Sequence, residues 1–225
     1  MKRMIVGLIL VGLLAVPSSS AAADKPVSFS IGGGITKPVG GVGDSLGSGG
    51  QVTLGLGFKV KPQITVFGEY NFSSLGKKLL DVPQPLTAAS AAFSGNGWYQ
   101  YGGGGVSFTP WQSGKASAYV LGGIGVYNRS VYLTTPSTGL VTVCNPAWFV
   151  CFPQPVTVDK VVASRGTTDP GVNLGGGFTY RVSDLASFFV EVRYHYVWGP
   201  EFQTASGGTQ SANAQFFPIT FGFRF

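Results

Sequence analysis

Charge is scarce in this sequence. Asp, Glu, Lys and Arg make up 11% of its 225 residues, against roughly 25% in an average soluble domain. The formal net charge is +6 and no long basic run occurs, so we exclude a nucleic-acid binder. One histidine and two cysteines are too few for a His/Cys metal centre. We therefore expect no metal and no cofactor.

The chain also lacks an apolar run long enough for a membrane-spanning helix. The longest run, Met4–Val16, has 13 residues, whereas a spanning helix needs ~20. It follows Lys2 and Arg3 and precedes Ala21–Ala23, which is the pattern of a secretory signal peptide with an Ala-x-Ala cleavage site. We expect residues 1–23 to be removed and residues 24–225 to form one domain.

Glycine and aromatic residues are abundant instead. The chain has 35 Gly, 17 Phe, 9 Tyr and 4 Trp, and so many aromatics exclude a disordered chain. Apolar and polar residues alternate with period two, which indicates β-strands. We predict eight strands: Val27–Thr36, Gln51–Val60, Ile64–Phe72, Trp98–Thr109, Ala116–Arg129, Val172–Arg181, Ser187–Val197 and Gln215–Phe225.

The connections between these strands alternate in length. Three are short: Lys61–Gln63, Pro110–Lys115 and Val182–Ala186. Four are long and rich in Gly, Pro, Ser and Thr: Pro38–Gly50, Ser73–Gly97, Ser130–Gly171 and Trp198–Ala214. Antiparallel strands with tight turns at one end and long loops at the other are typical of outer-membrane barrels, which have short periplasmic turns and long extracellular loops.

Periodicity alone leaves open which face of the strands is inside. A soluble lipocalin-like barrel points its apolar face inward. Three observations favour an apolar face against lipid: strands of ~9–11 residues, aromatics at several strand ends, and a chain that ends on Phe221-x-Phe223-x-Phe225. We predict an all-β fold, an eight-stranded antiparallel transmembrane up-and-down β-barrel.

Two segments resemble a known family. Phe217–Phe225 resembles the C-terminal strand that outer-membrane barrels present to the barrel-assembly machinery, with Phe221, Phe223 and Phe225 as the signal. Phe188–Tyr196 resembles the penultimate strand of the opacity-type proteins and of the transmembrane domain of outer membrane protein A. The resemblance implies a protein of the cell outer membrane of a Gram-negative-type bacterium. No peptidoglycan-binding periplasmic domain is expected, because nothing follows the last strand.

The face opposite the apolar one carries single charged or polar residues that a barrel would enclose. We predict an interior polar cluster of Glu69, Arg129, Arg181, Glu191, Arg193, His195 and Arg224. The interior of an eight-stranded barrel is just wide enough for side chains to fill, and buried charges are costly unless they are paired. We interpret the cluster as a structural ion-pair network rather than as acid–base machinery.

Two motifs could suggest catalysis or phosphate binding. Small lipid A deacylase barrels use a Ser–His pair, with the serine two positions after the histidine; after His195 this position is Val197, so we expect no catalytic residues. Gly102–Gly105 lacks the Lys-Ser/Thr of a phosphate loop. These glycines instead indicate curvature or close packing of a large inward residue such as Tyr99 or Tyr101.

Cys144 and Cys151 lie in the longest predicted loop. An even cysteine number in an exported protein predicts a disulfide. A metal site would need further ligands near them, and the single histidine lies elsewhere. We therefore predict a structural bridge.

The sequence predicts function less sharply than fold. The leading interpretation is a non-catalytic, monomeric barrel with a structural, adhesive or surface-interaction role through its extracellular loops. Its partners would be outer-membrane lipid, the barrel-assembly machinery and surface or host ligands, with no nucleic acid. A narrow pore for small solutes and an outer-membrane lipid-modifying enzyme stay open as alternatives.

Overall fold

The structure is a computed structural model that describes residues 26–80, 93–145, 150–203 and 207–225. The expected signal peptide, residues 1–23, lies outside the described residues. The described chain contains ten strands and one short helix. No helix in these ranges is long and apolar enough to cross a membrane.

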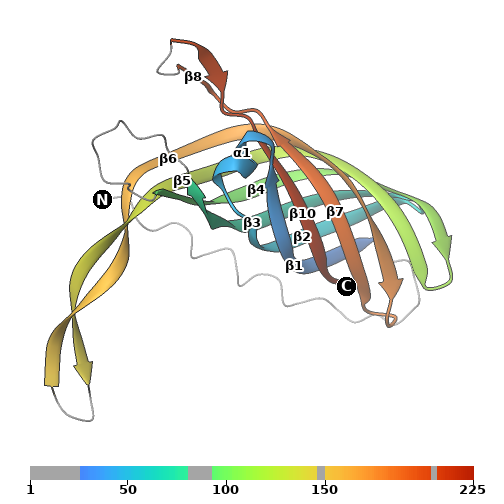
Figure 1. The fold of residues 1–225 in the computed structure, drawn as a ribbon. Coiled ribbons are helices and arrows are strands. Elements are labelled where there is room, and N and C mark those ends of the chain that lie inside the picture. The colour runs from blue at the N-terminus through green and yellow to red at the C-terminus, as the bar shows by residue number, and fades with distance from the viewer. Residues whose placement is uncertain (1–25, 81–92, 146–149, 204–206) are drawn as a thin grey trace, which may run out of the picture.

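Eight strands form a closed antiparallel barrel in the order β1-β10-β7-β6-β5-β4-β3-β2. Each pairs with its neighbour in the chain, and pairing of β1 with β10 closes the ring (Figure 1). The barrel strands are β1 (Val27–Val39), β2 (Gly49–Lys61), β3 (Ile64–Leu80), β4 (Phe93–Ser113), β5 (Ala116–Asn145), β6 (Val150–Arg181), β7 (Ser187–Val197) and β10 (Ala214–Arg224). The predicted eight-stranded up-and-down barrel is confirmed.

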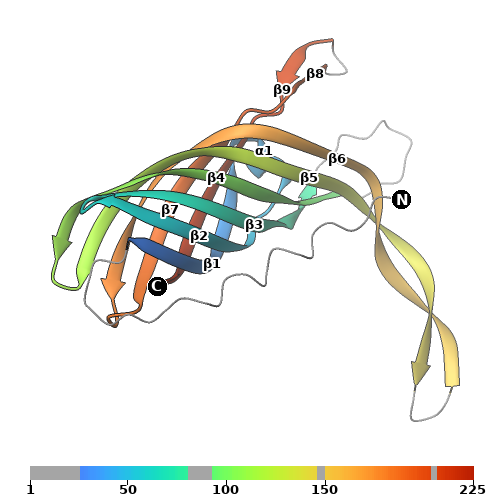
Figure 2. The same cartoon turned by 180° about the vertical axis from the view of Figure 1, so that it is seen from behind.

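Two strands are much longer than expected. The predicted loop Ser130–Gly171 is wrong over most of its length, because β5 and β6 stay paired as far as Asn145 and Val150. The register shifts once, between Leu133 and Thr134. Threonine and valine are frequent in this segment, and β-branched residues favour extended, paired backbone. Beyond the barrel the two strands form a twisted ribbon that bends away from it (Figures 1 and 2).

The same end of the barrel carries two smaller elements. Helix α1 (Gly40–Ser45) lies between β1 and β2, and β8 (Glu201–Gln203) pairs with β9 (Thr209–Ser211) in a short hairpin between β7 and β10. The hairpin projects from the end where the β5–β6 ribbon leaves (Figure 2). The opposite end has the tight turns after β2, β4 and β6 and the end of β10.

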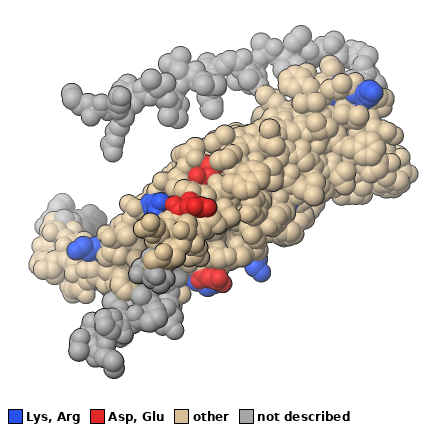
Figure 3. All heavy atoms as spheres, turned by 90° about the horizontal axis from the view of Figure 1, so that it is seen from above, with Lys and Arg blue, Asp and Glu red and all other residues tan. Residues whose placement is uncertain are grey.

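The predicted facing of the strands is also observed. Leu56 in β2 and Phe221 in β10 are 39% and 46% exposed on the outside, whereas their neighbours in the chain Gly55 and Thr220 point inward. The visible face of the molecule is a broad uncharged band, with charged side chains toward its two ends (Figure 3). Such a band matches the hydrocarbon core of a bilayer.

Inward glycines make room for tyrosine rings. A Cβ atom at Gly171 would lie 2.6 Å from Cε2 of Tyr127, and one at Gly103 would lie 2.5 Å from the hydroxyl of Tyr101. Any larger side chain at these two positions would collide with the ring. The interpretation of the Gly102–Gly105 run as space for a large inward residue therefore holds for Tyr101.

Candidate functional site

An ion-pair group crosses the lumen in its short-turn half. Arg193 of β7 donates from Nε to Oε1 of Glu191 and from Nη2 to Oε2 of Glu69 in β3, each over 2.5 Å. The Tyr119 hydroxyl donates to the other oxygen of Glu191 over 2.8 Å. All three charged side chains are more than nine-tenths buried. One guanidinium therefore serves two carboxylates, and we call this group the triad.

His195 lies farther up the lumen, among aromatic rings. Its Nδ1 is 2.6 Å from the Tyr127 hydroxyl, and the rings of Tyr101 and Tyr127 meet it edge-on. Asn173 donates to the Tyr101 hydroxyl over 2.8 Å. Two residues on, Val197 is fully buried. Among the described residues, no three His, Cys, Asp or Glu side chains gather in a group that could hold a metal.

A neutral polar network fills the lumen beside these residues. Oε1 of Gln51 accepts from Asn71 over 3.0 Å and from Thr36 over 3.1 Å, and its Nε2 donates to Thr220 over 2.7 Å. Asn71 also donates to Thr53. This network was not predicted from the sequence, because the predicted interior cluster included only the ionisable residues of the inner face. The strand periodicity already placed Gln51 and Thr53 on that face.

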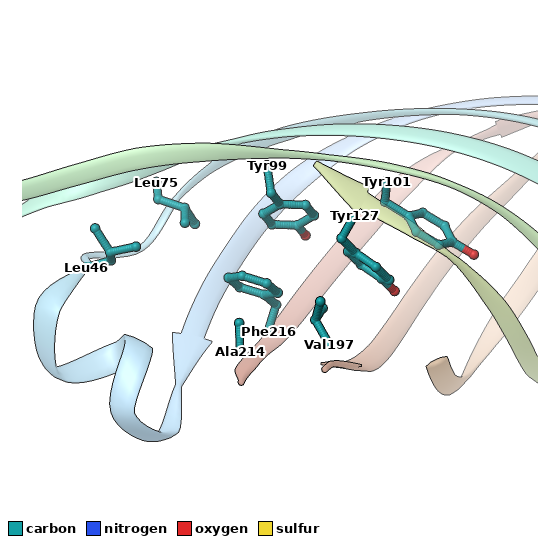
Figure 4. Packing of buried hydrophobic residues seen from close by; sticks show 8 residues of the cluster. All are labelled: Leu46, Leu75, Tyr99, Tyr101, Tyr127, Val197, Ala214 and Phe216. Atoms are coloured by element: carbon teal, nitrogen blue, oxygen red, sulfur yellow. The ribbon is translucent and has the colours of Figure 1, made fainter. Parts of the chain in front are cut away.

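Aromatic side chains close the lumen toward the loop end. Tyr99 stacks on Phe216 with 4.4 Å between ring centroids, and Tyr101 packs on Tyr127 at 4.7 Å. All four rings are buried. Tyr99 and Phe216 meet from opposite walls, whereas Tyr101 and Tyr127 are paired on neighbouring strands (Figure 4). We call this cluster the aromatic plug; it comprises Leu46, Leu75, Tyr99, Tyr101, Tyr127, Val197, Ala214 and Phe216.

Arg129 does not join the triad, contrary to the sequence prediction. It forms an ion pair with Asp169, and both of its Nη atoms donate to the carbonyl oxygen of Ala212 over 3.2 Å. This clamp ties β5 and β6 to the segment between β9 and β10. Asp169 was missed because it fell within the predicted loop, where strand periodicity was not applied.

Two other predicted members of the cluster lie at the short-turn end. Arg181 is exposed at the end of β6, so its place in the interior cluster is corrected: the strand ends there and the side chain reaches solvent. Arg224 is half-buried, with its guanidinium carbon 5.3 Å and 5.5 Å from the ring centroids of Tyr119 and Phe189.

The remaining predicted residues are the three phenylalanines of the last strand and the two cysteines of the ribbon. Phe221, Phe223 and Phe225 are exposed along the outside of the last strand, and the backbone of Phe225 exchanges two hydrogen bonds with Phe29. Their role as an assembly signal stays a prediction. In the ribbon the register pairs Cys144 with Cys151. The side chain of Cys144 is outside the described residues, so the bridge also stays a prediction.

The β5–β6 ribbon has one face rich in valine. Val141 on β5, and Phe152 and Val158 on β6, share this face by register and are exposed by 39%, 46% and 43%. The opposite face carries Leu140 and Thr138 with prolines. A long two-stranded ribbon with exposed apolar residues is unusual outside an interface.

Prolines protect the edges of this ribbon. Three prolines lie on the same face of the ribbon, at alternate positions of the ladder: Pro136 on β5, and Pro153 and Pro155 on β6. Proline has no N–H and fits a paired strand only where that position faces the outer edge. The edges therefore lack donors at these three points, which disfavours addition of a further strand.

A family model for the outer membrane protein β-barrel domain matches residues 7–225. The chain belongs to this family. It is similar in structure to a major outer membrane protein from Thermus thermophilus, at 14% identity over 88% of this chain and 97% of the other, with a TM-score of 0.54. It is also similar to neisserial surface protein A, at 12% identity over 88% and 96%, with a TM-score of 0.52. Such identities show the fold alone, and no curated protein sequence matches.

Family membership sets the orientation of the molecule. The protein lies in the outer membrane, with its short turns in the periplasm and its long loops, including the β5–β6 ribbon, outside the cell. The triad is in the periplasmic half of the lumen, and the aromatic plug and the Arg129–Asp169 clamp are toward the extracellular mouth.

Proposed function

We propose that this protein is a non-catalytic outer-membrane barrel that acts through its extracellular ribbon, as a surface adhesion or contact protein. The observation that carries the proposal is the ribbon itself, with its exposed Val141, Phe152 and Val158 on one face and its proline-protected edges. A paired ribbon presents a preformed contact surface at lower entropic cost than an irregular loop would.

The filled lumen supports contact over conduction. The stacked rings of Tyr99 and Phe216 and the fully buried Tyr101 and Tyr127 occupy the cross-section that a solute would have to pass. An eight-stranded barrel has little further width to spare. A pore would require these rings to leave their packed positions, so conduction is the weaker of the two functions.

The surroundings of His195 argue against a lipid-modifying enzyme. Its Nδ1 is taken by the Tyr127 hydroxyl inside the barrel, and the next inward residue of its strand, Val197, has no hydroxyl to activate. A lipid substrate would lie against the outer face, on the other side of the barrel wall. We therefore propose no catalytic step.

The closed ring, in which every barrel strand has two neighbours, supports a monomer.

An adhesion assay with serine variants tests the role of the ribbon. Cells displaying the protein are compared with cells displaying a Val141→Ser/Phe152→Ser/Val158→Ser variant in adhesion to abiotic and epithelial surfaces. The matched control is Leu140→Ser, which removes an apolar side chain from the opposite face. We expect adhesion to fall in the triple variant and to persist in the control, with equal amounts of heat-modifiable protein in the outer membrane. Equal adhesion of all three proteins would contradict the proposal.

Conductance of the purified protein in planar bilayers tests the alternative. We expect no discrete channel steps, because the aromatic plug closes the lumen. Steady single-channel currents that grow when Tyr99 and Phe216 are both replaced by alanine would favour the pore.

A further inference from the structure

Below the triad the lumen is hollow. A small cavity of about 40 Å³, open to solvent, lies in the periplasmic half of the barrel. Its wall is rich in hydroxyl groups, whereas the upper lumen is rich in aromatic rings: Ser28, Ser30, Thr65 and Ser107 line it together with the triad and Arg224. This space holds a few water molecules, so it suits only a very small polar ligand.

Arg224 is the distinctive residue of this cavity. Among the described residues no carboxylate pairs with it, whereas Arg193 holds two. Its guanidinium lies over the rings of Tyr119 and Phe189. These contacts restrain the guanidinium, and its N–H groups, which no carboxylate of the described residues holds, are the part left for a ligand. That planar fork matches a carboxylate or phosphate group.

The formal charges of the cavity wall balance, because two carboxylates face two guanidiniums, and the excess of positive charge lies at the periplasmic mouth. The two carboxylates in the cavity wall are already engaged by Arg193, and Nη1 of that residue is buried without a hydrogen-bond partner in the described chain. Toward the periplasmic mouth, a second hollow, open to solvent, is lined by Lys115 and Arg181 with serine and threonine hydroxyls. A mouth lined by cations attracts anions and raises their local concentration.

We propose that this cavity is a binding site for a small oxyanion from the periplasm, a carboxylate or phosphate group held by the fork of Arg224 and by the hydroxyls of Ser28 and Ser30. The site is separate from the extracellular ribbon and does not depend on the function proposed for it. The triad closes the inner end of the cavity, so the anion enters and leaves on the periplasmic side.

The test uses the full chain, folded in an uncharged maltoside detergent. Arginine side-chain NMR signals are followed while sodium acetate, inorganic phosphate or ammonium chloride is added. We expect saturable shifts of the Arg224 signal with acetate or phosphate, and none with ammonium beyond a chloride control. The Kd of the parent and of every variant is read from the signal of Arg193, which also lines the cavity. Arg224→Gln should weaken anion binding about ten-fold or more, because it removes the charged fork. Arg165→Gln, which removes an exposed arginine at the extracellular end, should leave the Kd unchanged.

Two conservative variants distinguish a loss of binding from a loss of folding. Arg224→Lys keeps the charge but loses the fork, and should bind more weakly than the parent protein while still showing heat-modifiable migration. Ser30→Ala removes one hydroxyl and should weaken binding by a smaller factor. Absence of saturation with both anions, equal Kd values for the parent and Arg224→Gln proteins, or saturable binding of ammonium instead would each overturn the proposal.

Discussion

Replacing Arg193 should destabilise the barrel more than replacing either of its carboxylate partners. Arg193→Gln removes the one cation that Glu69 and Glu191 share at 2.5 Å and leaves two buried carboxylates facing each other. Breaking a buried pair by removing one partner costs about 3–5 kcal/mol, and two stranded carboxylates place this variant at the upper end of that range. Water in the adjacent cavity would lower the loss.

Glu191→Gln should be much milder. Arg193 keeps its ion pair with Glu69, and a glutamine oxygen can still accept the hydrogen bond from Arg193 Nε. The loss is then that of weakened hydrogen bonding, about 1–2 kcal/mol. Glu69 is what keeps Arg193 from being left as an unpaired buried cation in this variant.

Urea titration of the refolded proteins, followed by tryptophan fluorescence and by heat-modifiable migration, measures the difference. A Glu69→Gln/Glu191→Gln/Arg193→Gln variant serves as the neutral control. It should recover most of the loss, because no buried charge remains and neutral replacements of a buried ion group are often tolerated. Equal losses for Arg193→Gln and Glu191→Gln, or a neutral variant no better than Arg193→Gln, would refute the shared-cation reasoning.

Three further predictions concern the membrane face, assembly and the ribbon. Leu56→Arg should lower the free energy of unfolding in lipid by about 2–4 kcal/mol, and Ser28→Arg by clearly less because it enters the cavity; urea titration in vesicles compares them, and equal losses would contradict the facing. Deleting Phe225 should lower the amount of protein in the outer membrane without changing the stability of the folded fraction, and wild-type amounts would count against an assembly role. Unreduced protein should resist thiol alkylation, and Cys144→Ser/Cys151→Ser should leave barrel migration unchanged; alkylation without reductant would exclude the bridge.

The interior of the barrel is packed with side chains toward the extracellular end and contains a cavity toward the periplasmic end. Above the triad, Tyr99 and Phe216 are in contact across the barrel. Below it, Ser28, Ser30 and Ser107 line a cavity that stays unfilled. Small residues in so narrow a barrel forgo packing energy, and a ligand that occupies the space would offset this cost.

Strand periodicity was sufficient to predict much of this molecule. Alternation in segments such as Ser187–Val197 specifies both an extended chain and the face of every side chain, because successive residues of a strand point to opposite sides. The prediction therefore placed Glu191, Arg193 and His195 together on the inner face and Val190 on the outer face. The alternation of short and long connections likewise predicted antiparallel neighbours and the two ends of the barrel.

Periodicity does not specify depth along the barrel or partners across it. Arg129 and Arg193 both face inward, yet one pairs with Asp169 near the extracellular mouth and the other with Glu69 in the periplasmic half. Which inward residues share a level depends on the register of all eight strands and on their tilt, a property of the closed ring. A residue's face is a local consequence of strand geometry, whereas its neighbours across the lumen exist only once β1 has paired with β10. For this reason the fold and the inner face could be predicted from the sequence, and the triad, the clamp, the aromatic plug and the cavity were decided only by the tertiary structure.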